Sequence, residues 1–268
     1  MLIFARLLAV RHRSARAATH ARNQWRSLRD LGLTARLRAA QRWFSPTFLA
    51  VFEETEPLVT ICIATFNRAR LLSERTLPSL LRQSYAKLEI LVVGDCCTDD
   101  TGARIAALGD PRIRFINLPT RGPYPEEPER RWMVAGSTPM NRALREARGS
   151  FITHLDDDDE YTPDRIEKLL TLLRHTRSDF AFHPFRAQLK DGSWWDNPAP
   201  RFELGYVTTS SVFYHSFWKS IEWDLKAWRY AEPGDWNRFR KIRFLGAKIA
   251  RHSDSMLVHY REQDQADR

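Results

Sequence analysis

The chain has 268 residues, of which 43% are hydrophobic and 28% charged, a composition typical of globular proteins with one large or two small domains. The whole net charge of +9 lies in residues 1–50, which contain ten Arg, no Lys and a single acid, Asp30, whereas the remainder contains 32 basic and 32 acidic residues. This distribution argues against nucleic-acid binding by the protein as a whole.

Simple features of the sequence disfavour other classes of protein. No apolar run approaches the length of about 18 residues that spans a bilayer. The first residues place their apolar side chains before the Arg cluster, which is the reverse of a secretory signal peptide. The three cysteines are an odd number, too few for a disulfide framework, and lack a Cys-x-x-Cys zinc spacing. We therefore expect a cytoplasmic protein.

Residues 1–50 are predicted to form an Arg-rich helical appendage. They are rich in Ala, Leu and Arg, which favour helices, and their apolar residues recur near a helical period as far as residue 44, interrupted only by Gly32. Ser45 and Pro46 end this segment. Residues 51–57 follow as a short polar linker.

From residue 58 the chain alternates between strands and helices. Continuous apolar, β-branched runs predict strands buried on both faces, at 58–64, 88–93, 113–117 and 151–155. Helical periods and start signals predict helices at 70–83, 99–108, 139–147 and 162–175, the third with Thr138 as its N-cap. This alternation favours an α/β fold with a mainly parallel sheet.

The remaining segments are less regular. Residues 180–189 and 194–195 predict a hairpin that turns at Asp191-Gly192, and 207–214 a strand. A helix is expected at 236–245, closed by Gly246, with short strands at 247–251 and 256–260. The segment 118–137, which contains four prolines, is predicted to be a loop.

The most distinctive chemical feature is a run of five acids, Asp156 to Glu160, directly after a predicted strand. Such a run is often a solvated charged face. However, the carboxyl ends of strands in α/β sheets are where ligands bind, and five neighbouring acids repel one another. A divalent cation with carboxylate ligands, Mg²⁺ or Mn²⁺, would supply the missing counter-charge.

Two further polar segments follow strands and are expected at the same sheet edge. Residues 65–68 come after the first strand, and Asp95 ends the second. The structural alternative is that both are plain strand-to-helix turns, with Asn67, Thr98 or Asp99 as helix caps.

Five segments, taken in order, resemble the family 2 glycosyltransferases, which have the GT-A fold. They extend from Pro57 to about Arg261 and read PLVTICIATFNRARLL, TLPSLLRQSY, LEILVVGDCCTDDT, MNRALREARGSFITHLDDDDEYTPDRIEKL and PGDWNRFRKIRFLGAKIA. Each motif is short, but their shared order and spacing make the resemblance specific.

The resemblance implies a metal-dependent enzyme that moves a sugar from a nucleotide-diphosphate sugar, expected to be a UDP-sugar, to a hydroxyl of a carbohydrate or lipid-linked acceptor. It implies Mn²⁺ or Mg²⁺ as cofactor, inversion at the anomeric carbon, and a role in polysaccharide, lipopolysaccharide or glycoprotein assembly. Residues 58–160 would then bind the nucleotide sugar and 161–268 the acceptor.

The resemblance also assigns nucleotide-binding residues. Those matched to the base, the ribose and the rest of the donor are Thr65, Phe66, Asn67, Arg68, Asp95, Asn141, Asp156 and Asp157. The family usually has Tyr where Phe66 stands, so stacking is kept and a hydroxyl is lost. At Gly94-Asp95-Cys96-Cys97 the family usually has two Asp followed by Gly-Ser.

The acidic run corresponds to the DxD motif of the family, and Pro163 fixes how the two sequences align. By this resemblance Asp158 is a direct metal ligand, and Asp156 is its partner toward the ribose or the metal. His259 is a third candidate metal ligand; a structural role is the alternative. Asp159 and Glu160 are interpreted as charges at the N-terminus of the following helix.

Asp235 is the candidate catalytic base, with Glu232 in reserve, because the acceptor hydroxyl must lose its proton as it attacks the sugar. The alternative is that Asp235 only caps the helix that follows. Residues 121–132, with several Arg and aromatic side chains, are a candidate lid or else a surface loop stiffened by proline.

Two rival functions remain. A sugar-phosphate nucleotidyltransferase would want a Gly-rich phosphate loop, and residues 64–68 contain no Gly. A non-catalytic adaptor that binds a membrane or nucleic acid on a transferase fold is disfavoured by the retained Asp158 and Asp235. Residues 1–50 are expected to lie on an anionic membrane surface or to pack on the domain or a partner, with an organellar presequence as a third alternative.

Overall fold

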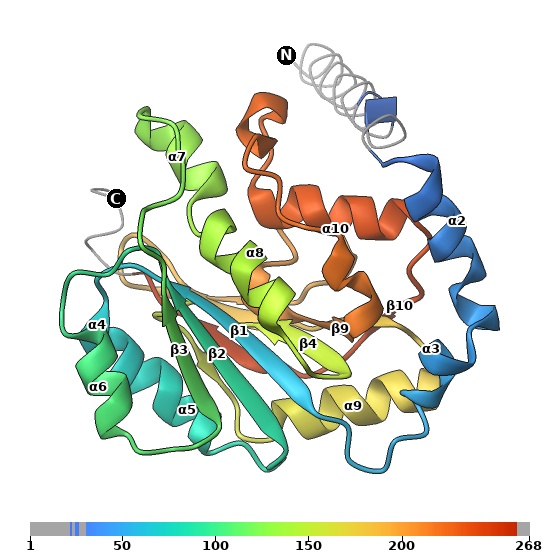
Figure 1. Ribbon diagram of the computed structural model, residues 1–268, viewed down its shortest axis with the longest axis horizontal. Coiled ribbons are helices and arrows are strands. Elements are labelled where there is room, and N and C mark those ends of the chain that lie inside the picture. Colours follow the sequence, from blue (N-terminus) through green and yellow to red (C-terminus); the bar gives the residue numbers. More distant parts are fainter. Residues whose placement is uncertain (1–21, 23–24, 27–30, 262–268) are drawn as a thin grey trace, which may run out of the picture.

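The structure is a computed structural model that describes residues 22, 25–26 and 31–261. A seven-stranded sheet in the order β10-β6-β9-β4-β1-β2-β3 lies at its centre (Figure 1). Its strands are β1 (Val59–Thr65), β2 (Leu88–Gly94), β3 (Ile113–Asn117), β4 (Phe151–His154), β6 (Phe180–Phe182), β9 (Val212–His215) and β10 (Ile249–Arg251). Only β9 runs antiparallel to its neighbours in this sheet. The predicted α/β fold with a mainly parallel sheet is confirmed.

The register of the central strands determines where polar residues gather. Val59 of β1 lies opposite Leu88 of β2 and Phe151 of β4. The three parallel strands therefore run side by side, and the segments that follow them emerge at the same edge of the sheet.

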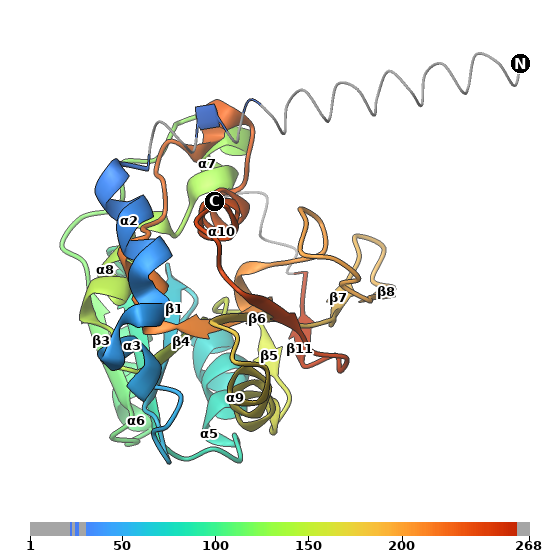
Figure 2. The ribbon, with the colours of Figure 1, turned by 90° about the vertical axis from the view of Figure 1, so that its right-hand side faces the viewer.

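Both faces of the sheet are covered by helices, which explains the continuous apolar strands (Figures 1 and 2). Ile61 and Ile63 belong to one core, with apolar residues of α5 (Leu77–Leu81), α6 (Thr101–Ala107) and α9 (Arg165–Thr176). Cys62, between them, belongs to the opposite core, with residues of α8 (Ser137–Glu146) and α10 (Gly234–Phe244). The helix before α5 begins as α4 (Ala69–Leu71) and passes through a π-helical turn, η2 (Leu72–Thr76).

A second sheet, in the order β5-β11-β7-β8, stands beside the first. It consists of β5 (Glu160–Tyr161), β7 (Phe185–Gln188), β8 (Trp194–Asn197) and β11 (Leu257–His259). The β7–β8 hairpin turns where expected, since Gly192 has a φ of +81°. Because β4 belongs to the first sheet and β5 to the second, the acidic run bridges the two sheets.

Several boundaries differ from the sequence predictions. The predicted loop 118–137 contains a helix, α7 (Pro128–Val134), which begins at a proline, as the first turn of a helix allows. Helix α8 starts at Ser137 after Gly136, so Thr138 lies inside it and is not the N-cap. The predicted strand 207–214 is shorter, because a 3-10 turn, η3 (Thr209–Ser211), precedes β9.

Residues 31–50 pack on the domain, whereas most of the predicted helix before residue 31 lies outside the described residues. They form α2 (Leu33–Gln41), the 3-10 turn η1 (Arg42–Phe44) and α3 (Pro46–Ala50), which Ser45 caps. The buried Arg42 side chain donates to Asp179 at 2.6 Å. The linker 51–57 is only partly polar, since Phe52 is buried in the core.

Two 3-10 turns, η4 (Ser216–Ser220) and η5 (Ala227–Tyr230), lie between β9 and α10. No helix among the described residues is both long and apolar enough to cross a membrane.

Candidate active site

A cavity of about 610 Å³ opens at the sheet edge where β1, β2 and β4 end. Nine of the eleven site residues expected from the sequence line it: Thr65, Phe66, Arg68, Asp95, Asp156, Asp157, Asp158, Asp235 and His259. They come from five separate segments of the chain. The cavity is also lined by Arg121, Arg131 and Trp132 of the candidate lid.

Asn67 and Asn141 do not line this cavity, and both have structural partners. Asn67 has a φ of +50°, accepts from the backbone N–H of Thr98 at 2.9 Å and donates to its hydroxyl at 3.2 Å. It therefore ties together the loops after β1 and β2. Asn141 is buried on α8, where its amide exchanges two hydrogen bonds with the backbone of Trp223, at 2.7 and 3.0 Å.

One end of the cavity offers a flat apolar face beside a buried carboxylate. Asp95 is 3% exposed, and its Oδ1 accepts from the backbone N–H of Gly122 at 3.0 Å. The guanidinium of Arg121 lies 3.6 Å from the ring centroid of Phe66 and 3.9 Å from Asp95. An aromatic face, a cation and an acceptor in this arrangement suit a planar, hydrogen-bonding heterocycle.

The backbone around Asp95 is tightly constrained. A side chain on Gly94 would meet Asn117 Oδ1 at 2.6 Å, and this same oxygen accepts from the N–H of Cys97 at 2.8 Å. Cys96, between them, has a φ of +63°. This turn holds Asp95 toward the cavity, although its sequence departs from the usual family pattern.

Arg68 provides a counter-charge for the acidic run. Its guanidinium donates to Asp157 at 2.9 Å and also to Asp158. Burial raises the pKa of Asp157 to about 6, although the charge of Arg68 opposes this rise. The expectation that a divalent cation alone balances these acids is therefore incomplete, because a side chain of the protein already neutralises part of the charge.

Asp156, Asp159 and His259 form a second group, whose potential ligand atoms all lie within 4.8 Å of one another. Asp159 is fully buried and accepts from His259 Nδ1 at 2.9 Å, from the N–H of Tyr260 at 3.1 Å and from the hydroxyl of Ser210 at 3.3 Å. Burial raises the pKa of Asp156 and of Asp159. Burial alone would lower the pKa of His259, but the adjacent carboxylates, chiefly Asp159, raise it to about 9.

The interpretation of Asp159 and Glu160 as helix N-terminal charges is wrong. Helix α9 begins at Arg165, and Glu160 belongs to β5, which pairs with β11. This pairing turns Asp159 inward toward His259. Asp158, the expected metal ligand, is not part of this group and accepts from Arg68. Carboxylate and imidazole donors together fit Mn²⁺ once His259 loses the proton that the neighbouring carboxylates hold on it, so the residues present suit the expected metal.

Asp235 and Glu232 differ in how free their carboxylates are. Asp235 lies in the first turn of α10 and lines the cavity, its Oδ1 accepting from the N–H of Trp236 at 2.6 Å. Burial raises its pKa. Glu232 is buried in an ion pair with Arg240 at 2.9 Å and also accepts from Asn237. The N-cap of α10 is Pro233, so Asp235 does not cap the helix.

Arg165 donates hydrogen bonds to groups that adjoin the acidic run, a role that the sequence did not reveal. It is fully buried and donates to the carbonyl of Ser210 at 3.1 Å and to the hydroxyl of Thr153 at 3.0 Å. The Ser210 hydroxyl in turn accepts from the N–H of Asp156 and donates to Asp159. The partners of Arg165 come from three separate strands or turns, so no local sequence pattern could have predicted this role.

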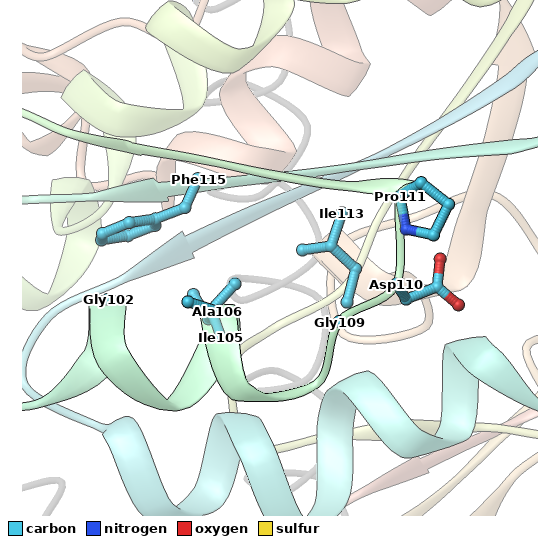
Figure 3. Close-up of a pocket in the computed structure, with 8 residues that line it drawn as sticks. All are labelled: Gly102, Ile105, Ala106, Gly109, Asp110, Pro111, Ile113 and Phe115. Atoms are coloured by element: carbon cyan, nitrogen blue, oxygen red, sulfur yellow. The ribbon is translucent and has the colours of Figure 1, made fainter.

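A second hollow, of about 400 Å³, lies between α6 and β3 (Figure 3). Of the side chains that line it, only Asp110 is ionisable, and Asp110 is paired with Arg112 at 2.8 Å. This hollow therefore offers no group for catalysis.

The fold is that of the GT-A glycosyltransferases. The S. aureus TarS structure in complex with UDP-GlcNAc superposes with a TM-score of 0.62 at 18% identity, covering 78% of this chain and 60% of TarS. The mannosyltransferase PcManGT of Pyrobaculum calidifontis, in complex with GDP-Man and Mn²⁺, gives 0.56 at 17% identity, covering 93% of this chain and 70% of PcManGT.

The chain belongs to glycosyl transferase family 2, whose model matches residues 60–125 and 129–243. The succinoglycan biosynthesis protein ExoO of Rhizobium meliloti is 36% identical over 115 residues, covering 42% of this chain and 29% of ExoO. WfgD of Escherichia coli, a UDP-Glc:alpha-D-GlcNAc-diphosphoundecaprenol beta-1,3-glucosyltransferase, is 29% identical over 126 residues, covering 47% of this chain and 44% of WfgD. The match thus spans less than half of either relative.

Proposed function

We propose that the protein is an inverting glycosyltransferase that moves a sugar from a UDP-sugar to an acceptor hydroxyl during the assembly of a polysaccharide. The observation that carries this proposal is that one cavity brings together three kinds of group: a stacking face with a buried acid, an acidic cluster, and the separate carboxylate of Asp235. These groups suit the base, the diphosphate and the reacting hydroxyl of such a reaction.

The donor end would bind the nucleotide through Phe66 and Asp95. The base would stack on the ring of Phe66, in contact with Arg121, and donate hydrogen bonds to Asp95. UDP is our choice because the TarS complex holds UDP-GlcNAc and the name of WfgD specifies UDP-Glc. The complex of PcManGT with GDP-Man makes a guanine nucleotide the competing result of the test.

Asp156, Asp159 and His259 would hold Mn²⁺ or Mg²⁺, with Asp158 close by, and the bound cation would neutralise charge that grows on the departing diphosphate. Arg68, which already carries positive charge into this region, would add to that neutralisation. The fixed loop between β4 and β5 orients these side chains before substrate arrives.

Asp235 would accept the proton of the acceptor hydroxyl as that oxygen attacks the sugar. Its raised pKa makes it a stronger base than an ordinary, solvated aspartate. Glu232 is unsuited to this role because its carboxylate is held by Arg240. A single displacement with one base on the acceptor side inverts the anomeric carbon.

The acceptor would approach across a rim formed by Trp132 and Leu204, which are 66% and 53% exposed. The cavity is also lined by Arg131 and Arg261. An apolar rim with cations suits a carbohydrate or a lipid-linked acceptor, and WfgD, by its name, uses a diphosphoundecaprenol-linked sugar.

The test combines donor binding and turnover in one set of variants. UDP- and GDP-linked sugars, with and without Mn²⁺, are screened for a rise in the thermal midpoint, and nucleotide release is then measured with the best donor. Asp235→Asn should keep the rise in midpoint, because the amide oxygen still accepts from Trp236, but should lower kcat by about 100- to 10,000-fold.

Glu222→Gln serves as the matched control, because this exposed carboxylate pairs with Arg145 outside the cavity. It should change neither binding nor turnover. The proposal is wrong if no sugar nucleotide raises the midpoint, or if Asp235→Asn turns over normally. Formation of a nucleoside triphosphate and a sugar 1-phosphate from the sugar nucleotide when pyrophosphate is added would instead indicate a nucleotidyltransferase.

A further inference from the structure

Exposed apolar side chains are concentrated in the N-terminal segment. Ten large hydrophobic side chains are exposed among the described residues, and five of them lie between Trp25 and Leu49. This segment is short compared with the rest of the described chain, so the concentration requires an explanation.

Helix α2 has two different faces. One face packs on the domain through Ala39 and the adjoining Arg42, which are 1% and 4% exposed. Leu33, Leu37 and Phe44 follow one another at intervals of four and seven residues and are 68%, 50% and 84% exposed. At about 3.6 residues per turn Leu33 and Leu37 lie on one side of α2, away from the buried Ala39, and Phe44 extends this exposed row into the 3-10 turn η1. We refer to this row as the α2 outer face.

The surroundings of the α2 outer face are basic. Arg36 and Arg38 are exposed on the same helix, and residues 31–50 contain no acid. Two acids near this segment are already paired: Asp179 is buried against Arg42, and Glu53 pairs with Arg177 at 2.5 Å.

The α2 outer face is also held in a fixed position. Arg42 donates to Asp179 at 2.6 Å and to the carbonyl of Gly246 at 2.5 Å. In the turn and helix that follow, Phe48 stacks on His215 with centroids 4.2 Å apart. Because these contacts anchor the segment, the α2 outer face is part of the folded domain and is exposed on its surface.

We propose that the α2 outer face binds an anionic lipid surface, an interaction that goes beyond the proposed glycosyl transfer. Leu33, Leu37 and Phe44 would enter the boundary between head groups and acyl chains, while Arg36 and Arg38 extend to lipid phosphates. A lipid surface is favoured over a protein partner because the row is narrow, flanked by arginine, and part of a region with ten Arg and one Asp.

The test measures flotation of the full chain with two kinds of vesicle: phosphatidylcholine alone, and phosphatidylcholine with phosphatidylglycerol. The full chain should bind only the anionic vesicles. The triple variant Leu33→Ser, Leu37→Ser, Phe44→Ser should reduce the partition coefficient at least tenfold. Arg36→Gln with Arg38→Gln should reduce it by about fivefold for each charge removed.

Matched controls separate this surface from general effects. Leu189→Ser and Trp194→Ser remove side chains that are 42% and 38% exposed on the β7–β8 hairpin and should not change flotation. Arg145→Gln removes an exposed charge on the body and should likewise leave it unchanged. Donor binding in solution should be normal in the triple variant, so failure of this inference and failure of the proposed function are distinguishable.

Three results would overturn the inference. The first is equal flotation with neutral and anionic vesicles, or none with either. The second is undiminished flotation of the triple variant, which would assign binding to other parts of the chain. The third is a dimer of the full chain that the triple variant converts to a monomer, which would make the α2 outer face a contact between two copies.

Discussion

Arg68 shows how one residue stabilises the acidic run. Its guanidinium contacts Asp157 and Asp158, and all three side chains are nearly buried. Without Arg68, two buried carboxylates would repel each other, which favours protonation of one of them or binding of another cation. A divalent ion that enters this region therefore meets a positive charge already in place.

We expect Arg68→Met to lower the thermal midpoint of the metal-free protein and to increase the rise in midpoint produced by Mn²⁺. The first effect follows from the uncompensated carboxylates, at a cost of about 1–3 kcal/mol, and the second from removal of a competing cation. Differential scanning fluorimetry without nucleotide measures both.

Arg70→Met is the control for this prediction, because Arg70 is exposed and pairs only at 3.6 Å with Glu74 on its own helix. A weaker response to Mn²⁺ in Arg68→Met than in the unmodified protein would contradict the prediction. In that case Arg68 would help to hold the cation.

Single residues could be predicted where a strand end fixes their position. Asp95 and Asp156 were found in this way and Asp235 through the resemblance to the family, and all three line the cavity. Asp159 was misassigned because its partner His259 lies 100 residues further along the chain. Asn141 looked like a binding residue because its sequence neighbours match the family, but its partner is the backbone of Trp223.

At the scale of elements, α3 is attached to the sheet through a neutral histidine. His215, at the end of β9, donates from Nε2 to the carbonyl of Phe48 at 3.1 Å and accepts at Nδ1 from the N–H of Phe217 at 2.9 Å. A second proton, on Nδ1, would lie against the N–H of Phe217, so the folded protein disfavours protonation of His215. Burial lowers the pKa of His215 to about 4.

The His215→Asn variant should therefore show a weaker dependence of stability on pH. As pH falls from about 6.5 to 4, the unfolded chain takes up a proton on His215 that the folded protein excludes, so the free energy of unfolding drops by about 3 kcal/mol. Asn can still accept from Phe217 but does not titrate. Urea denaturation at pH 7.5, 5.5 and 4.5 measures both proteins.

The difference in stability between the two proteins should be largest at pH 7.5 and should narrow toward pH 4.5. The buried His154 and His183 are present in both and cancel in the comparison. A constant difference across this range would show that His215 does not titrate as its burial implies.

Elements were predictable where both of their faces are buried. β1, β2 and β4 have continuous apolar sequences, and their positions were correct within one or two residues. Helix α7 was missed because it follows a segment with three prolines, is rich in charge, and has little buried surface. The predicted strand 180–189 splits into β6 and β7 at His183-Pro184, so that its two parts join different sheets.

For the whole molecule, the N-terminal segment belongs partly to the fold. Phe48 and Phe52 are each 4% exposed and pack in the core with Phe151 and His215. The basic appendage expected over residues 1–50 is therefore not separable from the domain at residue 50 or at the linker.

A chain that begins at Glu53 should melt about 10 °C or more below one that begins at Leu31. Loss of a buried Phe costs about 3–5 kcal/mol, and each kcal/mol lowers the midpoint by about 2–4 °C at this size. Thermal unfolding followed by circular dichroism compares the two chains. Equal midpoints would show that α3 contributes little to the core.

The pairing of β5 with β11 has a consequence for how the protein is made. Tyr161 lies opposite Leu257, so the strand that carries His259 joins the acidic run only after the chain has been made as far as β11. On the ribosome, Arg68 and the first four strands emerge long before this partner does. The nascent chain therefore carries its acids with one counter-charge in place, and the cluster of Asp156, Asp159 and His259 closes only once β11 has emerged.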